Sequence, residues 1–196
     1  MNLIFDIGGI IIDDSNRPLL QLLGMTTEQL AEFKQVVYHN DAWSEGVMLG
    51  YTTQEDYMRE LAAKYPQYQS ALERALSLDY QSQSVPRITD NMSAITKLKS
   101  RHQIYFLSNL TDATHAYLND FLSQFDGGAY SFQEHRKKPE PDFYRILLER
   151  YQLNPSDSIF FDDRLRNVEV ARQLGITAYH ISTPESLPEI LQRLDL

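Results

Sequence analysis

The sequence predicts an α/β protein built on a doubly wound parallel sheet, with a helical segment inserted after the first strand. Two observations lead to this prediction. Short apolar runs typical of buried strands alternate with helical patterns from residue 86 onwards, and this rhythm favours a parallel sheet covered on both faces. Residues 16–85 interrupt the rhythm, because they contain several helical patterns and no convincing strand.

The sheet domain begins at once, because residues 2–7 form an apolar run that delivers Asp6 at its end. Further strands are predicted over 103–107, 158–162 and 176–181, with a weaker one near 129–132. Helices are predicted over 88–100, 111–124, 140–152, 166–174 and 184–194. Two of them have start signals, Pro139 and Pro141 ahead of Asp142, and Thr183-Pro184-Glu185.

The inserted segment has helical patterns over 27–38, 53–64 and 68–77. The second of these follows Thr52-Thr53-Gln54-Glu55-Asp56, which has the spacing of a capping box. We therefore expect residues 16–85 to form a helical cap, and residues 1–15 and 86–196 to form the α/β domain.

Composition narrows the possible functions. A chain of 196 residues with 42% hydrophobic content suits one large domain, or one domain with a modest insertion. The net charge of −9 argues against a nucleic-acid partner and, more mildly, against anionic membranes. The absence of cysteine excludes disulfides, thiolate metal sites and cysteine nucleophiles. No signal peptide or membrane span is recognisable, so we expect a cytoplasmic protein, monomeric or weakly dimeric.

Polar side chains stand at the ends of several predicted strands. Asp6 ends the first strand, and Ser108 and Asn109 follow the second before a predicted helix. Ligands of open parallel sheets bind beyond the carboxyl ends of the strands. A hydroxyl group and backbone N–H groups at a helix N-terminus can bind a phosphate, although Ser-Asn after a strand is also a common helix cap.

Two further features have the same placement. Lys138 stands directly before Pro139, and Asp162 and Asp163 end the strand at 158–162. Adjacent carboxylates at a strand end suit a hard cation such as Mg²⁺, since unpaired carboxylates beside an apolar strand are otherwise costly. Taken singly these signals are weak, and their conjunction in this order is what is specific.

The order and spacing of these features resemble those of the haloacid dehalogenase-like hydrolases that have a helical cap. The stretch from Phe160 to Ile176 fits the pattern Phe-Phe-Asp-Asp-x-x-x-Asn-x-x-x-Ala-x-x-x-Gly-Ile throughout. The first motif, Asp13 and the stretch Trp43…Gly50…Thr53…Tyr57 are similar to the small sugar-phosphate phosphatases, the subgroup of the alpha-D-glucose-1-phosphate phosphatases. The resemblance implies a Rossmann-like core and places His135 where relatives often have glycine.

The resemblance also implies roles for individual residues. Asp6 would be the nucleophile, Ser108 and Asn109 would hold the transferring phosphoryl group, and Lys138 would neutralise its charge. Magnesium would be bound by Asp6, the Gly8 carbonyl oxygen and Asp163, with Asp162 as a second or outer ligand.

One member of the family's usual set is missing. Phosphatases of this family carry a second Asp, two residues after the nucleophile, which protonates the leaving oxygen and later activates water; here that position is Gly8. General acid–base catalysis is typically worth about 10²–10⁴ in rate.

From these features together we expect a Mg²⁺-dependent phosphatase for a small phosphorylated metabolite such as a sugar phosphate. The alternative is a catalytically weak or inactive protein that binds a phosphorylated ligand or partner in the same crevice. A dehalogenase is disfavoured, because such enzymes need no Mg²⁺, whereas the adjacent Asp162 and Asp163 suit a metal site.

Other residues are assigned less specific roles. Asp13 and Asp14 are considered as replacements for the missing acid, Asp13 first, but a loop or capping role is favoured for both. Trp43, with Tyr38 and Tyr51, would either cover the substrate or form an ordinary cap core. The five histidines are expected on the surface or in packing.

Overall fold

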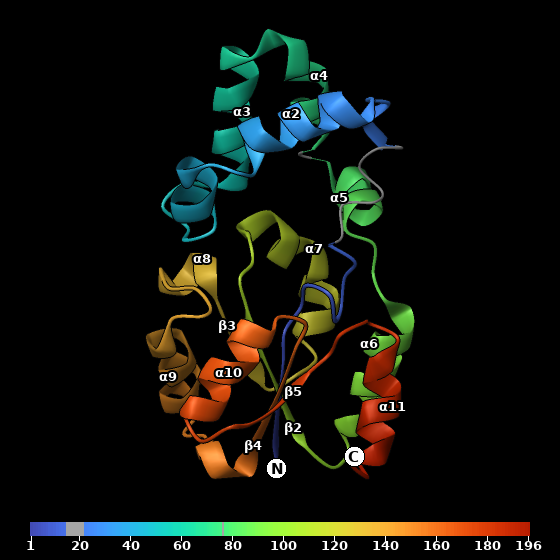
Figure 1. The fold of residues 1–196 in the computed structure, drawn as a ribbon, viewed down its shortest axis with the longest axis vertical. Coiled ribbons are helices and arrows are strands. Elements are labelled where there is room, and N and C mark those ends of the chain that lie inside the picture. Colours follow the sequence, from blue (N-terminus) through green and yellow to red (C-terminus); the bar gives the residue numbers. More distant parts are fainter. Residues whose placement is uncertain (15–21, 76) are drawn as a thin grey trace.

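The computed structural model describes residues 1–14, 22–75 and 77–196. A sheet domain that contains both termini lies below a separate group of helices (Figure 1). The five strands of the sheet are all parallel, in the order β3-β2-β1-β4-β5. They are β1 (Asn2–Phe5), β2 (Gln103–Ser108), β3 (Gly127–Tyr130), β4 (Ser158–Asp162) and β5 (Thr177–His180).

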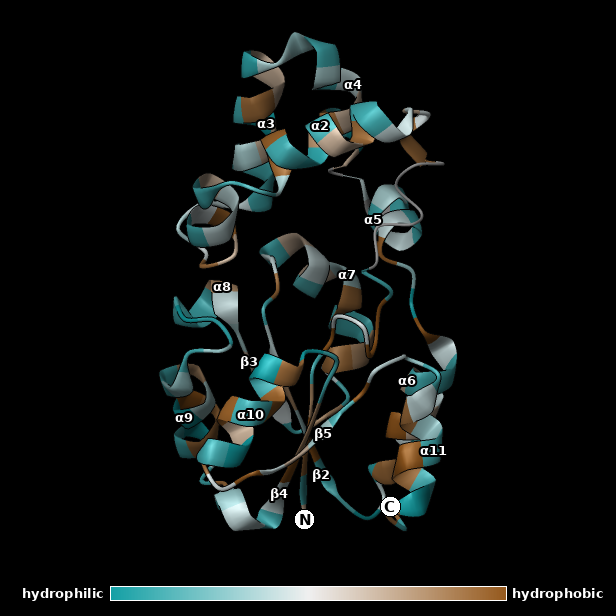
Figure 2. Cartoon of the chain, in the orientation of Figure 1, coloured by the Kyte–Doolittle hydropathy of each residue, from teal (hydrophilic) through white to brown (hydrophobic). Residues whose placement is uncertain are grey.

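Helices cover both faces of this sheet, as the doubly wound prediction requires. One face packs against α6 (Thr89–Leu98), α7 (Asp112–Leu122) and α11 (Ser186–Arg193). The other packs against α9 (Pro141–Arg150) and α10 (Leu165–Gln173). Strand β1 alternates between the two cores, because Leu3 and Phe5 point to the first and Ile4 to the second. The strands and the inner sides of the helices are accordingly the most hydrophobic parts of the domain (Figure 2). The predicted fold class is confirmed.

The inserted part has a core of its own. It comprises α2 (Thr27–Val37), the π-helix η1 (Ala42–Val47), α3 (Gln54–Lys64), the 3-10 helix η2 (Pro66–Tyr68), α4 (Gln69–Arg74) and α5 (Leu78–Ser84). Buried side chains such as Phe33, Tyr57 and Leu72 pack together here, apart from the two cores of the sheet domain. Helix α3 begins with an N-cap instead of the reciprocal capping box that was predicted, because the Thr53 hydroxyl accepts from the Asp56 N–H at 3.0 Å and donates to the Asp56 carboxylate at 2.8 Å. Among the described residues, no helix has both the length and the apolar character needed to cross a lipid bilayer.

The chain leaves and re-enters the sheet domain through two connections that lie side by side. The Asp13 N–H donates to the Pro86 carbonyl at 2.9 Å, and the Ile88 N–H donates to the Ile11 carbonyl at 2.8 Å. These backbone hydrogen bonds tie the two connections together at the base of the helical part. We propose that this helical part is a cap over residues 16–85, the boundaries expected from the sequence; residues 15–21 and 76 of that span lie outside the described residues.

Some local predictions are wrong. The strand expected near 129–132 ends at Tyr130, and α8 (Ser131–Glu134) follows. At this point the Ser131 hydroxyl accepts from the Leu110 N–H and donates to the Leu110 carbonyl, which fixes its side chain in the interior. The single helix expected over 68–77 is a 3-10 turn followed by α4, which ends at Arg74. Helix α5, η1 and η3 (Pro155–Asp157) were not predicted.

Candidate active site

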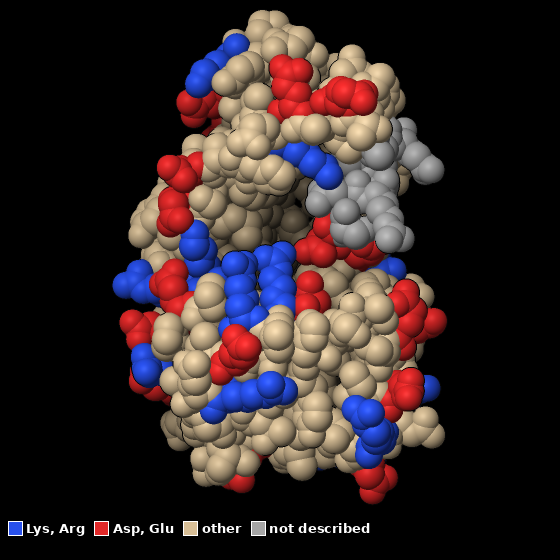
Figure 3. Space-filling model, in the orientation of Figure 1, with Lys and Arg blue, Asp and Glu red and all other residues tan. Residues whose placement is uncertain are grey.

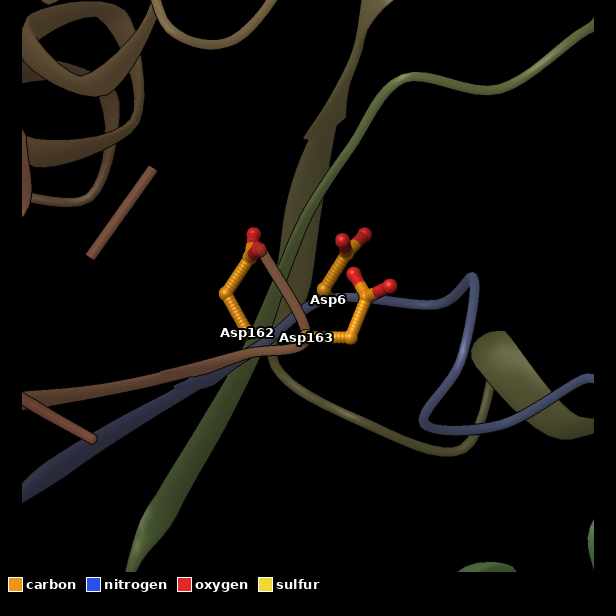
Figure 4. Close-up of side chains that lie close together, drawn as sticks. All are labelled: Asp6, Asp162 and Asp163. Atoms are coloured by element: carbon orange, nitrogen blue, oxygen red, sulfur yellow. The ribbon is translucent and has the colours of Figure 1, made fainter. Parts of the chain in front are cut away.

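Three carboxylates converge at the carboxyl edge of the sheet. Asp6 follows β1, and Asp162 and Asp163 stand at the end of β4, which is the neighbour of β1. One oxygen of each carboxylate lies within 4.8 Å of the others, and the side chains rise from the strand ends toward a common space (Figure 4). Parallel register brings these residues together, since Phe5 and Phe161 lie opposite each other immediately before them.

Asp6 is buried and held on both of its oxygens. Its Oδ1 accepts from the Ile7 N–H at 2.6 Å and from the Ser108 hydroxyl at 2.8 Å. Its Oδ2 lies 2.7 Å from the Lys138 ammonium nitrogen. Burial raises the pKa of Asp6 to about 7, against the opposing charge of Lys138 and with help from Asp162 and Asp163. Among the described residues, Lys138 and Arg164, whose Nε lies 4.0 Å from Asp163 Oδ1, set two cations against three carboxylates, so negative charge remains in excess here.

Lys138 joins two of the carboxylates. Its buried ammonium group lies 2.7 Å from Asp6 and 2.7 Å from Asp162. Burial alone would lower the pKa of Lys138, but the two carboxylates outweigh it and the pKa is raised. Asn109 holds the backbone of this lysine, because its amide accepts from the Lys138 N–H at 2.7 Å and donates to the Lys138 carbonyl at 3.0 Å. That positioning contact was not predicted from the sequence.

The adjacent carboxylates of Asp162 and Asp163 have different surroundings. Asp162 is fully buried, and its oxygens accept from the Asn167 amide, the Arg164 N–H and the Lys138 ammonium group. These partners hold the pKa of Asp162 low in spite of its burial. The Asp163 side chain keeps 30% of its surface exposed, and burial together with Asp162 raises its pKa. Asp163 is thus the better placed of the two to reach a ligand in the open part of the site.

The loop after β1 brings a further carboxylate into the site. Gly9, with φ +68°, lets this loop pass against Asp163, since a Cβ added at Gly9 would lie 2.9 Å from the Asp163 Cβ. Gly8 has no positive φ, but a Cβ added there would lie 2.7 Å from Asp14 Oδ2. Burial raises the pKa of Asp14, and Arg164, whose Nη2 lies 4.0 Å from Asp14 Oδ2, opposes that rise.

Two cavities meet at this point. The smaller one, of about 30 Å³, is lined by Asp6, Gly8, Asp14, Asn109, Lys138, Asp163, Arg164 and Asn167. The larger one, of about 480 Å³, is lined by Asp14, Tyr38, His39, Trp43, Met48, Gln54, Tyr80, Gln81, Ser84, Val85, Thr111, Thr114 and Arg164. Figure 3 shows the hollow between the helical part and the sheet domain, with Lys and Arg side chains gathered along its lower edge. Asp14 and Arg164 line both cavities and so mark the passage between them.

The three aromatic residues singled out in the sequence do not act together. Tyr38 and Trp43 meet edge to face at 4.9 Å and line the larger cavity, while Trp43 also packs against the core of the helical part. Tyr51 is 69% exposed and stacks instead on the His135 ring, with 4.9 Å between ring centroids.

His135 belongs to a contact between the helical part and the sheet domain. Its Nδ1 donates to the Leu49 carbonyl at 2.6 Å, and the neighbouring Lys137 donates to the Ser44 carbonyl at 3.0 Å. His135 also has the left-handed backbone, φ 53°, that glycine adopts readily. The loop that carries Lys138 is therefore fastened to the helical part.

Comparison with known sequences gives a family. A family model described as haloacid dehalogenase-like hydrolase matches residues 2–175. D-ribitol-5-phosphate phosphatase of Bacteroides thetaiotaomicron is 20% identical over 195 residues, which cover 91% of this chain and 90% of that protein. Mouse acyl-CoA dehydrogenase family member 10 is 38% identical over 71 residues, which cover 36% of this chain but 7% of that protein.

Solved structures share the fold over nearly the whole chain. A HAD family enzyme from Bacteroides thetaiotaomicron, in complex with magnesium and inorganic phosphate, superimposes with a TM-score of 0.74 at 21% identity. The match covers 96% of this chain and 98% of that one. L-2-haloacid dehalogenase from Xanthobacter autotrophicus, with chloropropionic acid covalently bound, gives a TM-score of 0.63 at 15% identity, covering 98% and 82%. At such identities the likeness establishes the architecture.

Proposed function

We propose that this chain, which belongs to the haloacid dehalogenase-like hydrolase family, is a Mg²⁺-dependent phosphatase that acts on a small phosphorylated metabolite. The observation that carries the proposal is the charge balance around Asp6. Three carboxylates converge there, and one buried lysine lies between two of them. A divalent cation would remove the remaining excess of negative charge and would let a phosphate ester approach the carboxylate of Asp6.

The donor set suits magnesium, which prefers oxygen ligands and keeps several waters. Asp6, Asp163 and the Gly8 carbonyl oxygen would bind the ion, as the resemblance implies. Asp162 would stay in the outer shell, because Lys138, Asn167 and the Arg164 N–H already occupy its oxygens. Bound there, magnesium would offset charge on the phosphoryl oxygens and orient them.

The protein's own groups would perform the chemistry. An Asp6 oxygen attacks phosphorus in line with the leaving oxygen, and the bond from phosphorus to that oxygen breaks. Lys138 would stabilise the negative charge on the phosphoryl group as it transfers, since its ammonium group lies 2.7 Å from Asp6. Ser108, whose hydroxyl donates to Asp6, and Asn109, which fixes the Lys138 backbone, would line the phosphoryl position. Water then attacks the aspartyl-phosphate and releases inorganic phosphate and free Asp6.

The larger cavity favours a hydroxylated leaving group. Its aromatic side chains, Tyr38 and Trp43, can face a sugar ring or a polyol chain. Its polar lining includes Gln54, Thr111 and Thr114, which also hydrogen-bond to one another. The name of one relative, D-ribitol-5-phosphate phosphatase, supports the same substrate class. A sugar phosphate or polyol phosphate is therefore the proposed substrate; the alpha-D-glucose-1-phosphate subgroup stays a prediction.

Phosphate release from a panel of sugar, polyol and aryl phosphates tests the proposal, with and without Mg²⁺. We expect Mg²⁺-dependent turnover that Asp6→Asn abolishes while the variant keeps its fold. No turnover of any ester by a protein that binds Mg²⁺ would favour the alternative, a protein that binds a phosphorylated ligand without hydrolysing it. Halide release from a 2-haloacid without metal would contradict the phosphatase assignment.

A further inference from the structure

The space beside Gly8 is filled by another carboxylate. The backbone at Gly8 is compatible with a side chain, because its φ lies outside the left-handed region that favours glycine. A Cβ there would nevertheless lie 2.7 Å from Asp14 Oδ2 and 3.4 Å from Asp14 Cγ. The end of the Asp14 side chain therefore occupies the space that a side chain at position 8 would enter.

Asp14 also stands where a leaving group would depart. The smaller cavity holds Asp6, Lys138 and Asp163, and the larger one extends under the helical part, with Asp14 and Arg164 common to both. A substrate with its phosphoryl group at Asp6 and its body in the larger cavity must place the bridging oxygen in the passage between them. A carboxyl group in that passage lies in the region where the leaving oxygen needs a proton.

From these two observations we propose that Asp14 is the general acid and base of the reaction, in place of the side chain absent at Gly8. The inference rests on the proposed phosphatase function and assigns its proton transfers. It revises the expectation that Asp13 comes first, because Asp13 lines neither cavity and its N–H is bound to the Pro86 carbonyl.

When Asp6 bonds to phosphorus, the electron pair of the breaking ester bond stays on the leaving oxygen, which takes the proton of the Asp14 carboxyl group. In the second step the Asp14 carboxylate takes a proton from water as the water oxygen bonds to phosphorus. The bond from phosphorus to Asp6 then breaks, and the enzyme returns with Asp6 ionised and Asp14 protonated.

Asp14→Asn tests this role, with Asp13→Asn as the matched control on the neighbouring residue. For a polyol phosphate, whose alkoxide is a poor leaving group, we expect kcat/KM of Asp14→Asn to fall by about 10²–10⁴. An aryl phosphate needs little protonation, so its first step should persist while the second slows. Phosphorylated Asp6 should then accumulate in Asp14→Asn during aryl phosphate turnover, detected by mass spectrometry of the quenched enzyme. Asp13→Asn should resemble the wild type in both assays.

A rescue experiment separates catalysis from structure. Asp14→Ala removes the carboxyl group and opens the space beside Gly8, so adding Gly8→Asp to that variant should restore part of the polyol phosphate hydrolysis. Gly8→Asp alone should be impaired, because its side chain meets Asp14. Equal losses on aryl and alkyl esters in Asp14→Asn without phosphoenzyme, unchanged polyol phosphate hydrolysis, or a double variant no better than Asp14→Ala would each overturn the proposal. A wild type without Mg²⁺-dependent turnover would instead overturn the phosphatase function itself.

Discussion

Replacing Gly50 with alanine tests how closely the helical part must sit on the sheet domain. Gly50 has φ +72°, and a Cβ added to it would lie 1.8 Å from the Phe132 carbonyl oxygen. Ordinary contact begins near 3.4 Å, so one of the two segments must retreat by about 1.6 Å, the difference between these distances. Phe132 belongs to α8, and the loop that follows carries Lys138. The displacement is therefore expected to reach the active site.

Gly24→Ala is a matched control for the cost of placing alanine in a left-handed backbone conformation. Gly24 has φ +62°, but its added Cβ would meet none of the described residues within 4 Å. Alanine in a left-handed conformation costs roughly 1–2 kcal/mol, and both variants should lose this amount of unfolding free energy. Only Gly50→Ala adds the collision. Because a misplacement of about 1 Å can cost about 10²-fold in rate, we expect kcat/KM of Gly50→Ala to fall by about that factor.

Urea unfolding measures the loss of unfolding free energy, and phosphate-release kinetics measure the loss of kcat/KM. Gly24→Ala should be destabilised with kcat/KM close to that of the wild type, whereas Gly50→Ala should lose activity beyond its loss of stability. If the two variants had the same kcat/KM, the reasoning that the Gly50–Phe132 contact sets the position of Lys138 would be refuted.

Three further predictions concern the metal and the larger cavity. Asp163→Ala should abolish Mg²⁺ binding in calorimetry, whereas Asp162→Ala should weaken it by about 10–100-fold, as for an outer-shell residue; equal effects would contradict the assignment. The folded-state pKa of Asp6 is raised to about 7, above its ordinary value, so the stability that this group contributes to the metal-free protein is present at low pH and lost as pH rises through that value. Mg²⁺ should displace the proton from Asp6, so the rise in melting temperature on adding Mg²⁺ should be larger near pH 8 than near pH 6. A pH-independent rise would argue against Asp6 as a metal ligand. Trp43→Ala should raise KM for sugar and polyol phosphates several-fold more than Tyr51→Ala, since Tyr51 does not line the larger cavity; equal KM values in both variants would argue against that substrate position.

The features that sequence predicted well follow from the topology of a parallel sheet. Neighbouring parallel strands end at the same edge, so residues at the ends of β1, β2 and β4 must meet, and Asp6, Ser108 and Asp163 do. The long amphipathic helices were also predicted within a few residues of their ends. Short elements such as α8 depend on tertiary contacts, here the Ser131 hydroxyl against the Leu110 backbone, which no local pattern reveals.

The contacts that sequence reasoning missed depend on loops that return from a distance. Asn109, which we propose to line the phosphoryl position, also holds the Lys138 backbone 29 residues away through its amide, and that contact was not predicted. Asp14 reaches Gly8 because the loop after β1 turns sharply, with the Ile11 N–H bound to the Ile7 carbonyl at 2.7 Å. Gly8 was the one sequence signal for the position of Asp14, since a missing side chain leaves space for another group.

The most direct test of the account is to look for the aspartyl-phosphate on Asp6. The protein would be mixed with Mg²⁺ and an aryl phosphate, quenched in acid within the first turnovers, and digested for peptide mass spectrometry, with Asp6→Asn and a metal-free sample as controls. We expect the mass of one phosphoryl group on the peptide that contains Asp6 in the wild type with Mg²⁺. We expect no such mass in the metal-free sample or in Asp6→Asn. Turnover of the ester with no phosphorylated Asp6 in the wild type or in Asp14→Asn would contradict the aspartyl-phosphate mechanism.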